Sequence, residues 1–181
     1  MPSVISHAAF ALAADAAFAP RGVPSHFWSF SIICSAIPDV DGIGFFFGIP
    51  YNHVFGHRGF FHFPFLGLLL SIFLVSVFFR NLKTFSKQWF FYIVFFFFLS
   101  SSHGILDAFT NGGLGVALMS PFDNMRYFFR WRPIMVSPIG IAPFFSQWGL
   151  AVIKSELVWV WLPSFLMVVI AYVLRRFWSF Q

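Results

Sequence analysis

Long apolar runs separated by short polar connections dominate the pattern along the chain. Three runs approach the length of a membrane-spanning helix, which needs roughly 20 mostly apolar residues. They cover residues 60–79, 89–109 and 157–174. Their Phe-rich segments have strand propensity, but an unpaired strand cannot satisfy its backbone groups in hydrocarbon. We therefore predict that all three runs are membrane helices.

The remaining segments carry a weaker version of this pattern. Residues 4–19 are Ala-rich and helical in character, and residues 27–37 are apolar and end at Pro38, where a helix is expected to stop or kink. We predict two short membrane helices here, followed by a loop or re-entrant piece over 42–51. Residues 110–154 mix Gly, Pro, Trp and Arg, and this mixture predicts an interfacial cap.

Composition supports a chain that lies in lipid. Of its 181 residues, 59% are hydrophobic and only 9% are charged, whereas soluble domains carry about 25% charged residues. So few charges cannot cover a water-soluble surface. The predicted fold is all-α: one polytopic membrane helix bundle over residues 1–181, with about five helices, a loop-rich cap at 110–154 and a last membrane helix at 157–174.

The formal net charge is +5. In a soluble protein this excess would suggest nucleic acid as a partner. Here the basic residues lie in short connections between apolar runs, so we expect membrane lipid as the partner and no nucleic acid. The single Cys34 excludes an internal disulfide and a cysteine-based zinc cluster, and we expect it to be a packing residue.

Acidic and imidazole side chains are predicted to converge at one membrane face. Consecutive spanning helices run antiparallel, so the first and third helices start on the face where the second and fourth end. The residues near those positions are His7, Asp39, Asp41, His57, His62, His103 and Asp107. Ionisable groups beside membrane helices are costly and usually functional, and burying several together is unfavourable unless a cation holds them. We therefore predict that these seven residues form a metal site.

The ligand types narrow the choice of metal. His103 and Asp107 are spaced i, i+4 and project from one helix face. Asp39 and Asp41 lie in a turn from which both carboxylates can face one site. Nitrogen and oxygen ligands without thiolate suit Zn²⁺ foremost, with Mn²⁺ or Fe²⁺ as alternatives. We expect one or two ions.

Structural roles remain open for several of these residues. Asp39 or Asp41 could instead cap the next segment, and Asp107 could make a polar contact between helices. The polar residues outside the cluster are expected to be structural; they are Asp15, His26, His53 and Glu156.

Three motifs resemble a known family. Pro-Asp-Val-Asp at 38–41, Gly-His-Arg-Gly-Phe-Phe-His at 56–62 and Ser-His-Gly-Ile-Leu-Asp at 102–107 resemble the YdjM-like family, described as LexA-regulated, membrane-bound, metal-dependent hydrolases. His7 fits the N-terminal histidine of that family, and the resemblance covers residues 1–140. Phe61 and Phe63 replace the Thr and Ser that family members often carry on either side of His62, so hydroxyls that would orient this histidine are absent.

The resemblance and the site chemistry together predict a metal-dependent hydrolase that acts through metal-activated water. Asp39 or Asp41 would bridge two ions or act as general base. Arg58, which lies between His57 and His62, would grip a phosphate bidentately. A site at the bilayer edge with basic groups nearby predicts an amphiphilic phosphoester or another lipid-linked substrate.

A non-enzymatic role is the alternative. The cluster could be a structural metal staple or the ion-handling site of a small transporter. Transporters more often place ionisable groups near mid-membrane on broken helices, whereas these groups lie near helix ends.

The resemblance implies a multi-pass protein of the inner (cytoplasmic) membrane, and the basic residues predict its orientation. The face opposite the site carries six: Arg21, Arg80, Lys83, Lys87, Arg175 and Arg176. The site face carries five: Arg58, Arg126, Arg130, Arg132 and Lys154. With Arg58 set aside as functional, the positive-inside rule places the site outside the cytoplasm.

Overall fold

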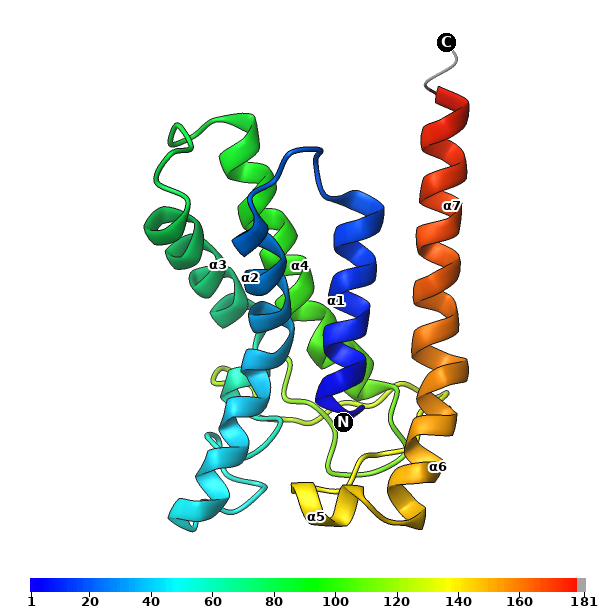
Figure 1. Ribbon diagram of the computed structural model, residues 1–181. Coiled ribbons are helices and arrows are strands. Elements are labelled where there is room, and N and C mark those ends of the chain that lie inside the picture. The colour runs from blue at the N-terminus through cyan, green and yellow to red at the C-terminus, as the bar shows by residue number, and fades with distance from the viewer. Residues whose placement is uncertain (179–181) are drawn as a thin grey trace.

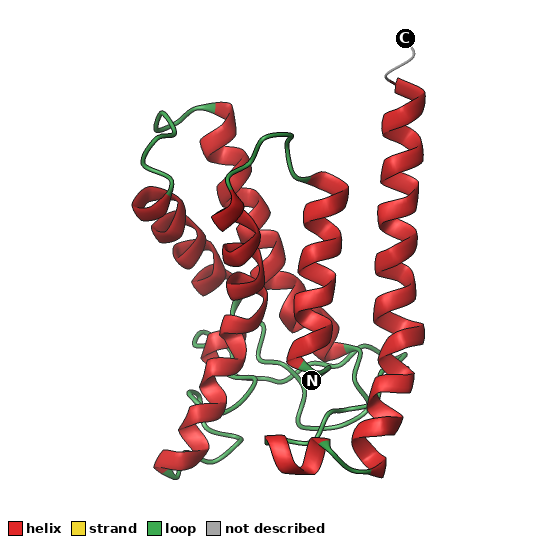
Figure 2. Ribbon diagram, viewed as in Figure 1, coloured by secondary structure: helices red, strands yellow, loops and turns green. Residues whose placement is uncertain are grey.

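Helices joined by irregular loops make up the described chain. The computed structural model describes residues 1–178, and within that range two isolated β-bridges occur but no β-strand. Figure 1 shows the order of the elements and Figure 2 their type. The elements are α1 (Val4–Phe18), α2 (Ser25–Ala36), the 3₁₀ helix η1 (Ile37–Phe47), the 3₁₀ turn η2 (Phe60–His62), α3 (Pro64–Phe78), α4 (Lys87–Ala108), α5 (Ile141–Phe144), α6 (Gln147–Glu156), the π-helical segment η3 (Leu157–Trp161) and α7 (Leu162–Trp178).

Helices α1 to α4 form an antiparallel bundle. Helix α1 packs on α2, α2 on α4, and α3 on α4, while α7 packs along α1. The N-terminal ends of α1 and α3 and the C-terminal ends of α2 and α4 lie at the same end of the bundle, where the long loops also gather (Figure 1). The predicted all-α bundle and its antiparallel course are confirmed.

Local sequence signals explain several helix ends. The hydroxyl of Ser3 accepts a hydrogen bond from the amide of Ser6 and caps the start of α1. Ser86 caps α4 in the same way through the amide of Trp89, at 3.2 Å. Helix α3 begins at Pro64, which has no N–H to satisfy in a first turn. Because Gly48 has a φ of +72°, it ends η1 in the left-handed conformation that glycine adopts without strain.

Aromatic rings fill the middle of the bundle. Phe27 of α2 is fully buried, with its ring centroid 4.7 Å from Tyr92 and 4.9 Å from Phe96 of α4. Ala11 and Ala14 are also fully buried, and their small side chains allow α1 to approach its neighbours closely. Lipid tails are as apolar as these side chains, so the hydrophobic effect does not hold membrane helices together. Close packing of this kind does.

Within residues 1–178, three helical segments are long and apolar enough to cross a membrane. They are Ser25–Phe47, Lys87–Ala108 and Gln147–Phe177, with lengths of 23, 22 and 31 residues. The second confirms the helix predicted at 89–109. The third contains the helix predicted at 157–174 but begins earlier, because α6 runs through η3 into α7. The last part of the predicted cap is therefore helical, while 110–140 is irregular as predicted.

Two predicted boundaries are wrong. The first part of the loop predicted at 42–51 is helical, because the 3₁₀ helix η1 continues the course of α2 to Phe47. Pro38 ends the α-helical hydrogen-bond ladder, yet its fixed φ fits the first turn of η1. The helix predicted at 60–79 begins only at Pro64, after the separate turn η2. Helix α3 thus has 15 residues, fewer than the roughly 20 of a full span.

Candidate metal centre

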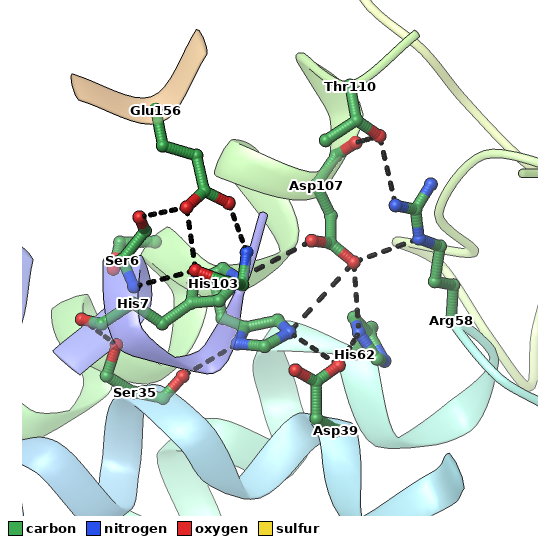
Figure 3. Close-up of polar contacts among 12 residues, drawn as sticks. Ser6, His7, Ser35, Asp39, Arg58, His62, His103, Asp107, Thr110 and Glu156 are labelled. Carbon is green, nitrogen blue, oxygen red and sulfur yellow. Dashed lines mark hydrogen bonds and ion pairs between the residues drawn. The ribbon is translucent and has the colours of Figure 1, made fainter. Parts of the chain in front are cut away.

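The seven predicted ligands meet at the loop-rich end of the bundle. His7 comes from α1, Asp39 and Asp41 from η1, His57 from the loop before η2, His62 from η2, and His103 and Asp107 from the last turns of α4. Six of them are buried and Asp39 is partly buried. Figure 3 shows that Asp39, His62, His103 and Asp107 point toward one another. Antiparallel threading thus brings together what the sequence predicted.

Four side-chain atoms face a common point, and we call their residues the four-ligand group: Asp39, His62, His103 and Asp107. Nε2 of His103 lies 3.2 Å from Oδ1 of Asp39, and Nε2 of His62 lies 3.4 Å from Oδ2 of Asp107. The two remaining nitrogen–oxygen separations are both 3.9 Å. A tetrahedral ion with bonds of 2.0–2.1 Å holds neighbouring ligand atoms about 3.3 Å apart. These atoms are therefore spaced like the ligands of one metal ion.

Most polar atoms of this group lack a hydrogen-bond partner. They include Nε2 of His62 and His103 and both carboxylate oxygens of Asp39 and Asp107. Leaving one buried polar atom unpaired costs about 1–3 kcal/mol, and more for a charged group. A cation among them would be bound by Nε2 of each imidazole and by one oxygen of each carboxylate. The donor set, two nitrogens and two oxygens, fits a divalent transition metal.

The other nitrogen of each ligand imidazole lies close to an acceptor oxygen. Nδ1 of His103 lies 2.6 Å from the carbonyl oxygen of Ser35. Because a carbonyl can only accept, Nδ1 is the donor of this hydrogen bond, and Nε2 is the ring nitrogen that faces Asp39 and Asp107. Nδ1 of His62 lies 3.1 Å from Oδ2 of Asp41. Metal-binding histidines are usually backed by a carbonyl or carboxylate in this way.

Asp41 organises the loop that carries His57 and His62. Its Oδ1 lies 2.7 Å from Nδ1 of His57, and its Oδ2 accepts the backbone N–H of Arg58 at 3.0 Å. With Asp39 and His57, Asp41 forms a second group whose ligand atoms lie within 4.8 Å of one another. An ion in that group would have to replace the contact between Asp41 and His57.

His57 reaches the edge of the site. It borders a pocket of ≈ 400 Å³ that is also lined by Tyr51 and Trp148. The rest of its lining comes mostly from the loops after α4, together with Pro143 of α5.

His7 lies beside the four-ligand group. Its ring stacks on that of His103 with centroids 3.8 Å apart and an interplanar angle of 13°. Its Nε2 is 3.6 Å from Oδ1 of Asp107, the carboxylate oxygen that the four-ligand group does not use. Both ring nitrogens of His7 are buried without a hydrogen-bond partner, so His7 is available to a second ligand position on Asp107.

Arg58 points into the protein, which differs from its predicted contact with a substrate phosphate. It is fully buried, with Nε 3.0 Å from Oδ2 of Asp107. Its terminal nitrogens donate to the hydroxyl of Thr110 and the carbonyl of Gly112, at 2.9 and 3.0 Å. The guanidinium is therefore committed to holding Asp107 and the loop that follows α4 (Figure 3).

The carboxylates control the charge of His62. Burial alone would lower its pKa, but the nearby carboxylates of Asp107 and Asp41 outweigh burial and raise the pKa of His62 to about 9. In the ion-free protein at neutral pH, His62 therefore holds a proton where a metal ligand needs a lone pair.

Sequence reasoning missed one contributor to the site, and it predicted the structural role of a second residue without its partners. The carbonyl of Ser35 is a backbone group and leaves no signal in the sequence. Glu156, predicted to be structural, is buried and accepts hydrogen bonds from the hydroxyls of Ser3 and Ser6, each at 2.7 Å, and from the amide of Ser3. It joins the end of α6 to the start of α1, next to His7 (Figure 3). The sequence signal for this buried contact is a single carboxylate, Glu156, at the start of an apolar run.

The other polar residues lie away from the site. Asp15 accepts a 2.7 Å hydrogen bond from Ser31 and joins α1 to α2. His26 and His53 are exposed. Cys34 is fully buried within the hydrophobic core, which confirms that it is a packing residue.

Comparison with known proteins agrees with the motifs. The model of the family described as YdjM inner membrane protein matches residues 1–178. The inner membrane protein YbcI of Escherichia coli (strain K12) is 37% identical over 179 residues, which cover 97% of this chain and 100% of YbcI. No solved structure matches.

Proposed function

Because the chain belongs to the YdjM family of inner membrane proteins, we propose that it is a membrane-bound metal-dependent hydrolase with one ion in the four-ligand group. The observation that carries the proposal is the gathering of unpartnered buried nitrogen and oxygen atoms at ligand spacing. Buried polar atoms in native proteins are almost always paired, and ionisable groups beside membrane helices are costly. So many unpaired atoms in one place therefore support a bound ion.

Zn²⁺ is the ion that suits the group best, since two imidazoles and two carboxylates at tetrahedral spacing are typical zinc ligands. Mn²⁺ or Fe²⁺ are the alternatives. For hydrolysis the Asp39 carboxylate would have to give way to water, because a catalytic ion keeps one position open. The bound ion would then supply Lewis acidity and an activated water. A second ion would require Asp41 to give up its contact with His57, so we propose one ion as the resting state.

The protein's own residues would orient and neutralise this site. Asp41 and the Ser35 carbonyl fix the two imidazoles, and Arg58 balances the charge of Asp107. Arg58 is then a positioning residue rather than a substrate ligand. Asp39 is the least enclosed member of the four-ligand group, with 8% of its side chain exposed, although both of its carboxylate oxygens are buried. We propose that a substrate or water approaches on this side and that Asp39 accepts a proton.

The position of the site points to an amphiphilic substrate. His7, His103 and Asp107 come from the ends of α1 and α4, and His62 comes from η2. These ends lie where the loops gather (Figure 1). A substrate with a polar, phosphorylated head and an apolar tail would span that boundary. We propose such a lipid-linked or phosphoester substrate, and no nucleic acid.

We also propose that the site lies on the extracytoplasmic side of the inner membrane. Of the five basic residues near the site, Arg58 is fully buried and Arg126 donates to the carbonyls of His57 and Tyr51. With the buried Arg58 set aside, the site side carries four basic residues against six on the opposite side, and the positive-inside rule then favours a site outside the cytoplasm. A membrane-impermeant maleimide should label Asn52→Cys in intact spheroplasts but label Asn81→Cys only after lysis. The opposite pattern would invert the orientation.

Metal content and hydrolysis test the proposed function together. The wild-type protein should purify with one ion per chain and hydrolyse a phospholipid or polyprenyl phosphate. His103→Ala should lose both, whereas His53→Ala, an exposed histidine on the same side, should keep both. Hydrolysis by a metal-free His103→Ala protein would refute a metal-dependent reaction.

A structural metal staple is the second candidate function. Four protein ligands fill a tetrahedral shell, and a closed shell is typical of structural zinc. The two functions differ at Asp39. In a hydrolase Asp39→Ala should keep the ion but change activity, whereas in a staple the same substitution should release the ion and lower the unfolding temperature.

A further inference from the structure

An apolar groove lies beside the candidate metal centre. It has a volume of ≈ 370 Å³ and is lined by Ile37 and Val40 of η1, Phe61 of η2, and Leu66, Leu69 and Phe73 of α3, among others. Its lining is hydrocarbon apart from the hydroxyl of Ser100 on α4. A groove with this lining offers no anchor for a polar ligand and suits a hydrocarbon chain.

The groove follows α3 into the bilayer. Leu66, Leu69 and Phe73 recur at helical spacing, so they line one face of α3. From the first to the last of them, α3 rises roughly 10 Å at about 1.5 Å per residue. Leu69 and Phe73 are also exposed, and α3 is one of the apolar helices of the bundle. The groove is therefore continuous with the surface that contacts lipid.

One end of the groove lies next to the metal ligands. Val40 is between Asp39 and Asp41 in the chain, and Phe61 directly precedes His62. Asp39, whose carboxylate oxygens are buried, follows groove residue Ile37 by less than one helical turn. A chain lying in the groove would have its polar end at the ligands and its tail along α3.

We propose that this groove binds the hydrocarbon chain of a phosphorylated lipid whose head lies at the four-ligand group. The inference rests on the proposed function for the role of the head, but the chain-binding groove can be tested without hydrolysis. A cation bound by the four-ligand group would attract a phosphate, whereas the apolar lining of the groove suits only the tail. A helix of a second copy is the competing occupant.

Crosslinking in nanodiscs tests the groove directly. The probe is dodecyl phosphate with a diazirine at the end of its chain, used with the full-length, zinc-loaded protein. We expect crosslinks on the α3 peptide near Phe73, displaced by dodecyl phosphate but not by inorganic phosphate. Leu69→Trp should reduce the crosslink yield at least tenfold, because the indole fills the groove.

Ile72→Trp is the matched control. Ile72 lies on α3 and is 37% exposed, against 47% for Leu69, but it does not line the groove. Its crosslink yield should stay within twofold of wild type. As a second variant, Phe73→Ala lengthens the groove and should shift binding toward a hexadecyl phosphate.

The outcomes distinguish failure of the groove proposal from failure of the proposed hydrolase function. Equal yields in Leu69→Trp and Ile72→Trp would overturn the groove, even if the protein hydrolyses a soluble probe such as p-nitrophenyl phosphate. If Leu69→Trp breaks up a dimer while the crosslink yield stays unchanged, the groove is an interface with a second copy and the lipid-binding proposal is wrong. If crosslinking depends on Leu69 but the protein hydrolyses nothing, the groove is supported and the proposed hydrolase function is contradicted.

Discussion

The carbonyl oxygen of Ser35 accepts a 2.6 Å hydrogen bond from Nδ1 of His103. This bond ties the end of α2 to α4 and turns Nε2 of His103 toward Asp39, 3.2 Å away. The His7 ring, stacked at 3.8 Å, supports the same orientation. The imidazole is thus fixed by the bundle itself, so a metal ion would meet a ligand that is already in place.

Asp41 should matter for metal affinity although its oxygens are engaged by the loop. Asp41→Asn keeps the side-chain shape but weakens the support of Nδ1 in His57 and His62. We expect zinc affinity to fall about 10- to 100-fold while the protein stays folded, as measured by competition with a chelator. Asp123→Asn, a half-buried loop carboxylate away from the site, is the control. Unchanged affinity in Asp41→Asn would show that Asp41 does not orient the ligands.

Arg58→Ala should destabilise the protein strongly. It leaves Asp107 buried without its guanidinium partner, 3.0 Å away, and breaking one partner of a buried pair costs about 3–5 kcal/mol. Unfolding of the ion-free protein in mixed micelles measures the loss, with exposed Arg132→Ala as control. A stable Arg58→Ala variant with only a raised KM would instead restore the predicted role of Arg58 as a phosphate ligand.

Glu156→Gln should loosen the start of α1. Oε2 of Glu156 accepts from both hydroxyls and Oε1 accepts from the amide of Ser3, whereas a Gln side chain has one accepting oxygen. An unpaired buried group costs about 1–3 kcal/mol. The expected result is a lower unfolding temperature, with faster hydrogen exchange confined to the first turns of α1. Lys154→Gln, an exposed change on α6, should have no such effect. Equal exchange in the two variants would count against the Glu156 contact.

Metal binding should depend on pH through His62. The pKa of His62 is raised to about 9 in the ion-free protein, so below that pH the ion must displace a proton. Affinity is therefore expected to weaken as the pH falls, by up to about tenfold per unit. Calorimetry in buffers of different ionisation enthalpy at pH 7 should detect about one released proton from His62 per ion. Binding without proton release would contradict this charge state.

The convergence of the ligands was predictable from sequence because it depends only on helix order. Once the apolar runs are read as antiparallel membrane helices, His7, His62 and His103 must lie near one face. The i, i+4 spacing of His103 and Asp107 then sets their common direction. These inferences need no knowledge of loop conformation.

The division of roles within the cluster was not predictable. Arg58 has a φ of +61°, and this left-handed backbone, which a pattern of residue types does not reveal, belongs to the turn that directs its guanidinium inward. The contacts of Asp41 with His57 and Arg58 depend on the 3₁₀ helix η1, part of which was predicted to be a loop. The partners of Glu156 lie about 150 positions away, so only the folded chain brings them together.

X-ray absorption at the metal edge of the purified protein tests the central claim most directly. The account predicts one ion per chain with nitrogen and oxygen ligands at about 2.0–2.1 Å, including two imidazoles. His62→Ala should reduce the imidazole signal by one, while His26→Ala, on the opposite face, should leave it unchanged. A protein that takes up no stoichiometric ion, or a spectrum identical in His62→Ala, would contradict the account.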